Sequence, residues 1–126
     1  MPGLLFVGEK PSLTAYRNGW RWEDGRLAAA TLFAALRAAN VDPAACGFVN
    51  LFGDHPDAPE HVERGSIAVL RGTARAGVKI IALGEKVRLN FVKFDVPHVA
   101  MVHPAARGAI RAREAYAAHV AEVVAA

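Results

Sequence analysis

Side chains suited to hydrolytic chemistry occur at two distant places in this chain, each directly after a short apolar run. Gly8-Glu9-Lys10-Pro11-Ser12 follows the first run, and His103-Pro104-Ala105-Ala106-Arg107 follows the last. Carboxylates and imidazoles are common general acids and bases. If the apolar runs are parallel strands, both groups lie at the carboxyl edge of one sheet, where α/β proteins build their sites. We therefore expect Glu9 and His103 to face a common pocket.

Both residues also have a structural interpretation. Glu9 can orient or activate a water molecule, or it can cap a helix or pair with an arginine. His103 precedes a proline that can begin a helix, so a neutral imidazole and the free amides there could hold a developing negative charge. It could equally serve the fold alone. The other histidines do not have a convincing metal-ligand spacing, and we expect no metal site.

An amide and two indoles are the candidates for recognising a base. Asn50 interrupts the apolar run from Phe48 to Phe52, so its amide either joins the backbone or offers a donor and an acceptor to a ligand. Trp20 and Trp22 could stack on an unpaired or flipped base, or they could plug the edge of the core. Basic side chains surround these two tryptophans in the sequence: Arg17, Arg21 and Arg26.

The elements that position these residues are predicted by apolar runs and helical periods. The runs at 4–7, 48–52, 79–83 and 98–102 are continuous, which is typical of strands covered on both faces. Helical spacing over 29–36, ended by Asn40, predicts one helix, and further helices are expected over 59–76, near 85–91 and along the C-terminal stripe from Ala109 to Val123. The segment 11–25 fits neither period and reads as a functional loop.

Alternating strands and helices predict the fold class. We expect an α/β protein, a three-layer α/β/α sandwich with a four-stranded, mostly parallel central sheet. The length of 126 residues favours a single domain over residues 1–126.

Composition limits the partners and the compartment. The net charge of +3 and pI of about 9.4 agree with contact to a polyanion such as DNA. The single cysteine, Cys46, excludes an intrachain disulfide or a cysteine-built cluster and reads as a buried thiol. No apolar run approaches the roughly 20 residues of a membrane span, and no secretory signal is evident. We expect a soluble intracellular, cytoplasmic protein.

In their order along the chain, these segments resemble the uracil-DNA glycosylase superfamily. Residues 8–12 look like its Gly-Glu-x-Pro-Gly motif, and residues 103–105 look like its His-Pro-Ser motif. Residues 18–27 are similar to the segment in which an aromatic residue precedes a Gly-x-Leu helix start by five residues. Residues 48–50 match the strand that ends in a base-reading asparagine, and residues 80–84 match the strand before a short helix.

The resemblance implies a monofunctional DNA N-glycosylase, a hydrolase that releases a flipped uracil or modified pyrimidine and leaves an abasic site. Glu9 would activate the attacking water, and His103 would hydrogen-bond the departing base anion. Trp20 would stack on the base and Asn50 would read its edge, with Gly8 in the same base-binding motif. The implied partner is single- or double-stranded DNA, and no cofactor is expected.

Three residues are candidates for phosphate contact. Ser12 closes the first motif in place of glycine, and Arg107 and Arg111 lie near the final helix, where they could instead solvate its outer face. The serine of the second motif is replaced by Ala105, and no large apolar wedge follows it. A modified pyrimidine, a mismatch or single-stranded DNA would therefore suit this chain better than uracil in a duplex.

Two other functions remain open at this point. A non-catalytic module that binds modified DNA or a nucleotide would keep the fold without the reaction. A general nucleotide-binding α/β domain is the third alternative, but the first turn lacks the Gly-x-Gly-x-x-Gly pattern and the chain has no Gly-Lys-Ser/Thr.

Overall fold

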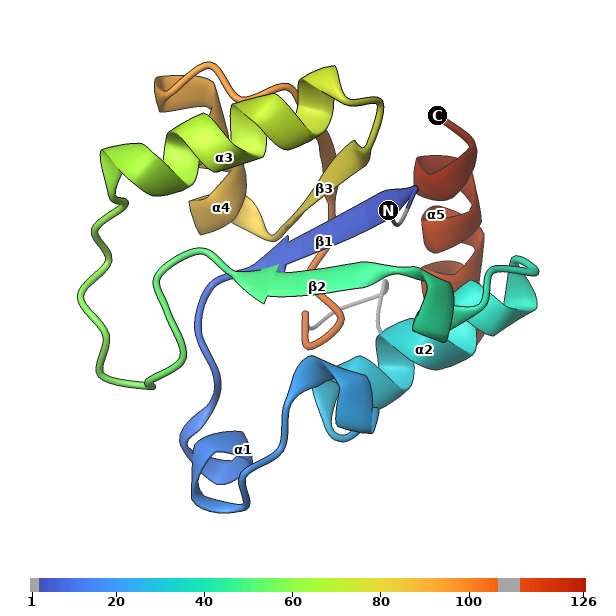
Figure 1. The fold of residues 1–126 in the computed structure, drawn as a ribbon. Helices are drawn as coiled ribbons and strands as arrows, with labels where there is room; N and C mark the ends of the chain where they lie inside the picture. The colour runs from blue at the N-terminus through green and yellow to red at the C-terminus, as the bar shows by residue number, and fades with distance from the viewer. Residues whose placement is uncertain (1–2, 107–111) are drawn as a thin grey trace.

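Four parallel strands form one central sheet in the computed structural model, which describes residues 3–106 and 112–126 (Figure 1). The strands are β1 (Leu4–Gly8), β2 (Gly47–Asn50), β3 (Lys79–Leu83) and β4 (Val99–Met101). They lie in the order β2-β1-β3-β4, and all pairings are parallel. The predicted fold class is confirmed, and the sheet is parallel throughout.

Five α-helices and two short 3₁₀ helices occupy the described connections. The α-helices are α1 (Leu13–Arg17), α2 (Ala28–Ala38), α3 (Arg64–Arg75), α4 (Glu85–Lys93) and α5 (Arg113–Ala125). The 3₁₀ helices are η1 (Trp22–Asp24) and η2 (Pro43–Ala45).

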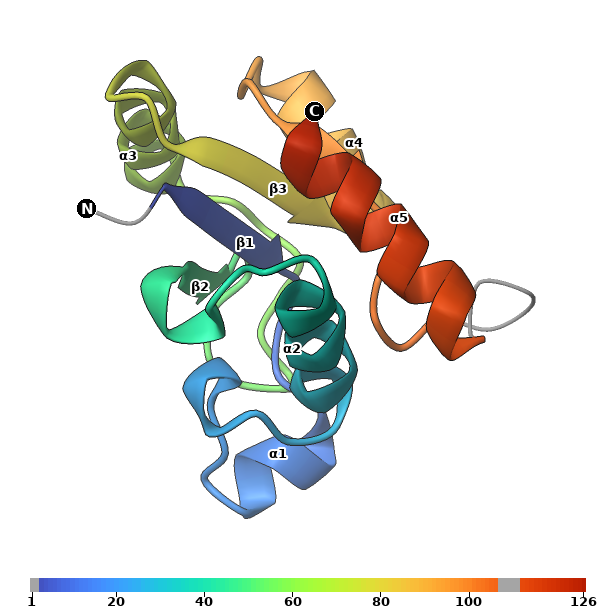
Figure 2. The same ribbon diagram turned by 90° about the vertical axis from the view of Figure 1, so that its right-hand side faces the viewer.

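The helices form a layer on each face of the sheet (Figures 1 and 2). Helices α2 and α5 pack side by side on one face, and α3 and α4 cover the other. Successive strand residues point to opposite faces, so Phe6 and Ile81 pack with α2 and α5 whereas Val7 and Ile80 pack with α3 and α4. This two-sided burial explains why the strand sequences are apolar throughout rather than alternating.

Two strand boundaries differ from the prediction. Strand β2 ends at Asn50 rather than Phe52, because the Gly53 amide donates to the Asn50 carbonyl and turns the chain. The Leu51 and Phe52 amides still donate to the carbonyls of Gly8 and Glu9, at 2.8 and 2.9 Å. Strand β4 covers only Val99–Met101.

The helix expected over 59–76 is shorter at its start. Helix α3 begins at Arg64, because Val62 is buried in the core on that face and Glu63 is extended with φ −70° and ψ 143°. Pro59 therefore belongs to the preceding loop and not to a first helical turn. Gly77, with φ 93°, follows the end of α3 as predicted.

The remaining helix predictions have mixed outcomes. Asn40 takes the left-handed conformation predicted after α2, with φ 59°. The segment 11–25 is not wholly irregular, because it contains α1 and η1. In the C-terminal stripe, Tyr116, Val120 and Val123 are buried in the core, while Ala109 lies outside the described residues.

Candidate active site

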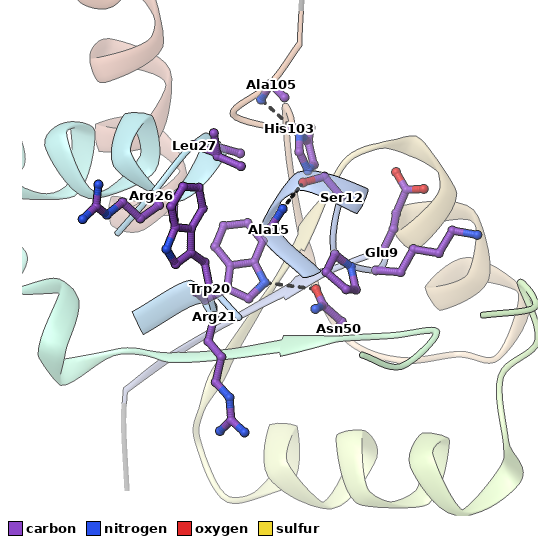
Figure 3. A pocket seen from close by; sticks show the side chains of 15 residues that line it. Glu9, Ser12, Ala15, Trp20, Arg21, Arg26, Leu27, Asn50, His103 and Ala105 are labelled. Carbon is purple, nitrogen blue, oxygen red and sulfur yellow. Dashed lines mark hydrogen bonds between the residues drawn. The ribbon is translucent and has the colours of Figure 1, made fainter. Parts of the chain in front are cut away.

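A cavity of about 570 Å³ opens at the carboxyl edge of the sheet (Figure 3). Its lining includes Glu9, Trp20, Asn50 and His103, which come from four separate segments of the chain. Glu9 follows β1, Asn50 ends β2, and His103 follows β4. The chain leaves β1 toward β2 and leaves β3 toward β4, so the connections diverge here and open a crevice.

The carboxylate of Glu9 and the side chain of His103 both come close to Gly84. A β-carbon at Gly84 would be 3.5 Å from His103 Cβ and 3.9 Å from Glu9 Oε2. The backbone there has φ 92°, which favours glycine, and the Gly84 amide donates to the Met101 carbonyl at 2.9 Å. The turn after β3 therefore leaves room for the acid and the imidazole next to one glycine.

A backbone hydrogen bond selects the tautomer of His103. The Ala105 amide donates to His103 Nδ1 at 3.0 Å, so Nδ1 must be unprotonated and the neutral ring carries its proton on Nε2 (Figure 3). Burial lowers the pKa of His103, and the nearby Glu9 carboxylate opposes this only in part. The result is a neutral imidazole with an N–H available to the cavity.

Helix α5 fixes the segment just before this histidine. The Val102 amide donates to His119 Nε2 at 2.9 Å, and the Tyr116 hydroxyl donates to the Val102 carbonyl at 3.0 Å. Both backbone groups of Val102 are thus held by side chains one turn apart on α5. Burial raises the pKa of Tyr116, so it stays a hydroxyl donor.

Glu9 has a cationic neighbour on α4. Lys86 Nζ lies 3.8 Å from Glu9 Oε1 and donates to Glu60 Oε1 at 2.6 Å. The hydrogen bond from Lys86 to Glu60 raises the pKa of Lys86 and lowers that of Glu60. Lys10 Nζ also donates to the Ala58 carbonyl, at 3.1 Å. These contacts tie the loop before α3 to the edge of the cavity.

Trp22 and Asn50 line the cavity and pack closely with Gly8 of β1, and we call these three residues the floor. Trp22 Nε1 donates to Asn50 Oδ1 at 3.0 Å, and the indole stacks on Phe48 with ring centroids 5.9 Å apart. A β-carbon on Gly8 would lie 3.0 Å from Trp22 Cζ2 and 3.1 Å from Asn50 Oδ1. Glycine is therefore the residue that lets these two side chains meet above β1.

The rim, which we define as Trp20, Arg26 and Leu27, is more open. The Arg26 guanidinium lies 5.3 Å from the centroid of the Trp20 ring, and Figure 3 shows Arg26 on the side of Trp20 away from Asn50 and Glu9. Leu27 is 49% exposed and has φ 56° and ψ −126°. A leucine with positive φ is strained, because its β-carbon crowds the backbone.

The phosphate candidates are placed as follows. Ser12 lines the cavity and caps α1, its Oγ accepting from the Ala15 amide at 3.2 Å. Arg107 and Arg111 lie outside the described residues. Arg21 and Arg26, which lie in the loop before α2, line the cavity instead.

The described residues contain neither a cluster suited to a metal ion nor a helix suited to a membrane. Within residues 3–106 and 112–126, no three or more His, Cys, Asp or Glu side chains form a group that could hold a metal ion. Within the same ranges, the helices are too short or too polar to cross a membrane.

Several residues that shape the site were not predicted in these roles. Trp22 was expected either to stack or to plug the core, whereas it also orients Asn50. Gly84, Tyr116 and His119 position His103 or its loop. The sequence feature that could have indicated Tyr116 and His119 is their spacing of three residues, which places them on one face of a predicted helix.

Neither a scan of protein-family models nor a search of curated proteins gave a match to this chain.

Proposed function

We propose that this protein is a monofunctional DNA glycosylase that hydrolyses the N-glycosidic bond of a flipped uracil or modified pyrimidine. The observation that supports it is the lining of one cavity by Glu9, Trp20, Asn50 and His103. Together they offer a carboxylate, a stacking surface, an amide and a neutral imidazole N–H. A water attacks C1′ of the sugar, the bond from C1′ to the base breaks, and its electrons leave with the base.

In this reaction His103 stabilises the departing base. Its Nε2–H donates to the negative charge that develops on the base oxygen, and the Ala105 amide keeps the opposite nitrogen unprotonated. A fixed donor of this kind contributes about 10²–10³ in rate. Since burial keeps the pKa of His103 low, the donor is neutral at physiological pH.

Glu9 acts on the other side of the broken bond. Its carboxylate orients the attacking water, takes the proton released when the water adds to C1′, and stabilises the positive charge that builds on the sugar. General-base catalysis contributes about 10²–10⁴ in rate. The side chain is 30% exposed, so water can reach it.

The rim and the basic side chains bind the flipped nucleotide and its neighbours in the strand. Removing a base from the stack costs a few kcal/mol, and stacking on an aromatic ring such as Trp20 returns about 1–3 kcal/mol. Arg21 and Arg26 also line the cavity and supply positive charge for flanking phosphates.

One observation favours the alternative, a module that binds modified DNA without catalysis. Lys86 lies 3.8 Å from Glu9 and could occupy the carboxylate in a purely structural ion pair. Under that alternative, Glu9→Gln leaves DNA binding unchanged, while Trp20→Ala still weakens binding.

Base release decides between the two. Single- and double-stranded oligonucleotides that carry uracil or a 5-modified uracil are incubated with excess protein and then cleaved with hot alkali at abasic sites. We expect cleavage by the wild type and a loss of about 10²-fold or more in Glu9→Gln and His103→Gln. Glu63→Gln and His61→Gln, which change exposed side chains away from the cavity, are the matched controls. No cleavage of any substrate by the wild type would reject the enzyme.

A further inference from the structure

The amide of Asn50 is held in one of its two orientations. An indole nitrogen can only donate a hydrogen bond, so the Asn50 atom 3.0 Å from Trp22 Nε1 must be the oxygen. The amide nitrogen then points away from Trp22. If the amide turned over, its NH₂ would face the indole N–H, and two donors would meet without an acceptor between them.

The groups that form this hydrogen bond have little freedom to move. Asn50 is a strand residue paired in register with Gly8, and the Trp22 ring stacks on Phe48 at an interplanar angle of 18°. Phe48 in turn packs against Phe6 and Phe33 of the core, with ring centroids 5.4 and 5.3 Å apart. The indole is therefore supported by the core rather than by solvent-exposed side chains.

The fixed orientation decides which base edge the amide matches. The oxygen retains a second lone pair, and the NH₂ group remains free to donate. Side by side, these pair with an edge that has a ring N–H next to a carbonyl, as in uracil and thymine. Cytosine has a ring acceptor next to an amino group, which requires the opposite orientation.

We propose that Trp22 is a positioning residue that sets the base preference of the pocket by holding the Asn50 amide through its Nε1–H. The inference rests on the proposed function for its enzymatic readout, but the preference itself is a property of binding. Trp22 acts through the amide of Asn50, so its loss should change the ratio of bases accepted.

The substitution that tests this is Trp22→Phe, which keeps an aromatic ring against Phe48 and removes the indole donor together with part of the ring system. With oligonucleotides that carry uracil or cytosine at one position, the wild type should release uracil in strong preference. In Trp22→Phe the ratio of uracil to cytosine release should fall about tenfold, the loss expected when this half-buried hydrogen bond no longer opposes the turned amide. Trp20→Phe is the matched control, because it alters stacking and should leave the ratio unchanged.

The outcomes separate this inference from the proposed function. Release of uracil by both proteins with an unchanged ratio would overturn the inference and leave the glycosylase intact. Absence of release by the wild type would reject the glycosylase, and binding then tests the inference alone. Free uracil and free cytosine are titrated into the ¹⁵N-labelled wild type, and the indole and amide signals of Trp22 and Asn50 are followed.

This titration needs no variant and so does not depend on Trp22→Phe folding. We expect uracil to shift the Asn50 amide signal at concentrations where cytosine does not, with the Trp22 indole proton still hydrogen-bonded. Equal affinity for the two bases, or no binding of either, would overturn the inference.

Discussion

The floor and the rim of the cavity differ in how their side chains are held. In the floor, Asn50 lies at the end of a strand and Trp22 stacks in an aromatic cluster. A hydrogen bond of 3.0 Å joins the two side chains. The rim relies on Trp20, which is half-buried and has the Arg26 guanidinium 5.3 Å from its ring centroid, and on Leu27, which is exposed and has a strained backbone. Fixed groups suit the reading of a base edge, whereas exposed apolar groups suit contact with a nucleic acid of variable shape.

This difference has an energetic consequence. A substitution in the floor disturbs groups packed against the core, so it should change stability and base recognition together. A substitution in the rim removes exposed surface, so it should change binding with little loss of stability, or even with a gain. Stability and activity measured on the same variants can therefore test whether the floor and the rim differ in this way.

The largest combined loss of stability and base release is expected for Gly8→Ala in the floor. The added β-carbon would lie 3.0 and 3.1 Å from Trp22 and Asn50, so these must separate. Overpacking of this kind costs about 1–3 kcal/mol of unfolding free energy, and base release should fall at least about tenfold with the lost hydrogen bond. Gly3→Ala, where no atom lies within 4 Å, is the control for both urea unfolding and base release. Equal behaviour of the two variants would show that the floor is not tightly packed.

Trp20→Ala in the rim should have a comparable effect on binding and almost none on stability. The loss of a stacking surface weakens binding by about 1–3 kcal/mol per base, measured by fluorescence anisotropy with a labelled single-stranded oligonucleotide. Tyr16→Ala removes an exposed aromatic side chain that packs on His55 outside the cavity, and this variant should bind normally. A large drop in unfolding free energy for Trp20→Ala would place this residue with the floor.

The residues at strand ends could be predicted because a general rule places them. Glu9, Asn50 and His103 each follow or end an apolar run, and parallel strands bring such positions to one edge. The layers of the fold were predictable for the same reason, since continuous apolar strands require helices on both faces.

What was not predicted depends on contacts between distant segments. The bond from Trp22 to Asn50 spans 28 positions, and no local pattern distinguishes the indole that stacks from the one that orients an amide. The start of α3 was misplaced because Val62 is buried before the helix begins, and that burial follows from the path of the loop. The hold of α5 on Val102 likewise requires the packing of the helix beside β4.

Leu27→Gly in the rim should have a smaller effect, and it should raise the unfolding free energy where Gly8→Ala lowers it. Glycine adopts φ 56° and ψ −126° without a clash, so relief of strain should raise the unfolding free energy by about 1 kcal/mol. The side chain lines the cavity, so base release should fall despite the more stable fold. Leu27→Ala keeps the β-carbon and should not gain stability. A loss of stability in Leu27→Gly would show that the leucine packs into the structure and is not a strained rim residue.

The smallest effect is the pH dependence contributed by His103. Burial lowers the pKa of this histidine below its ordinary value of 6.5, so on acidification the unfolded chain takes up a proton that the folded chain resists. Above pH 6.5 both forms are neutral and the group contributes no slope. Stability should fall as the pH decreases below about 6.5, until the folded histidine is itself protonated. Urea unfolding followed from about pH 7.5 to about pH 5, a range that brackets the ordinary pKa, should show a shallower loss in His103→Gln than in the wild type. His61→Gln should retain the wild-type slope, because His61 is exposed and not in the cavity. An identical slope in all three proteins would mean that His103 binds its proton equally well in the folded and unfolded chain, so burial would not be what keeps the imidazole neutral.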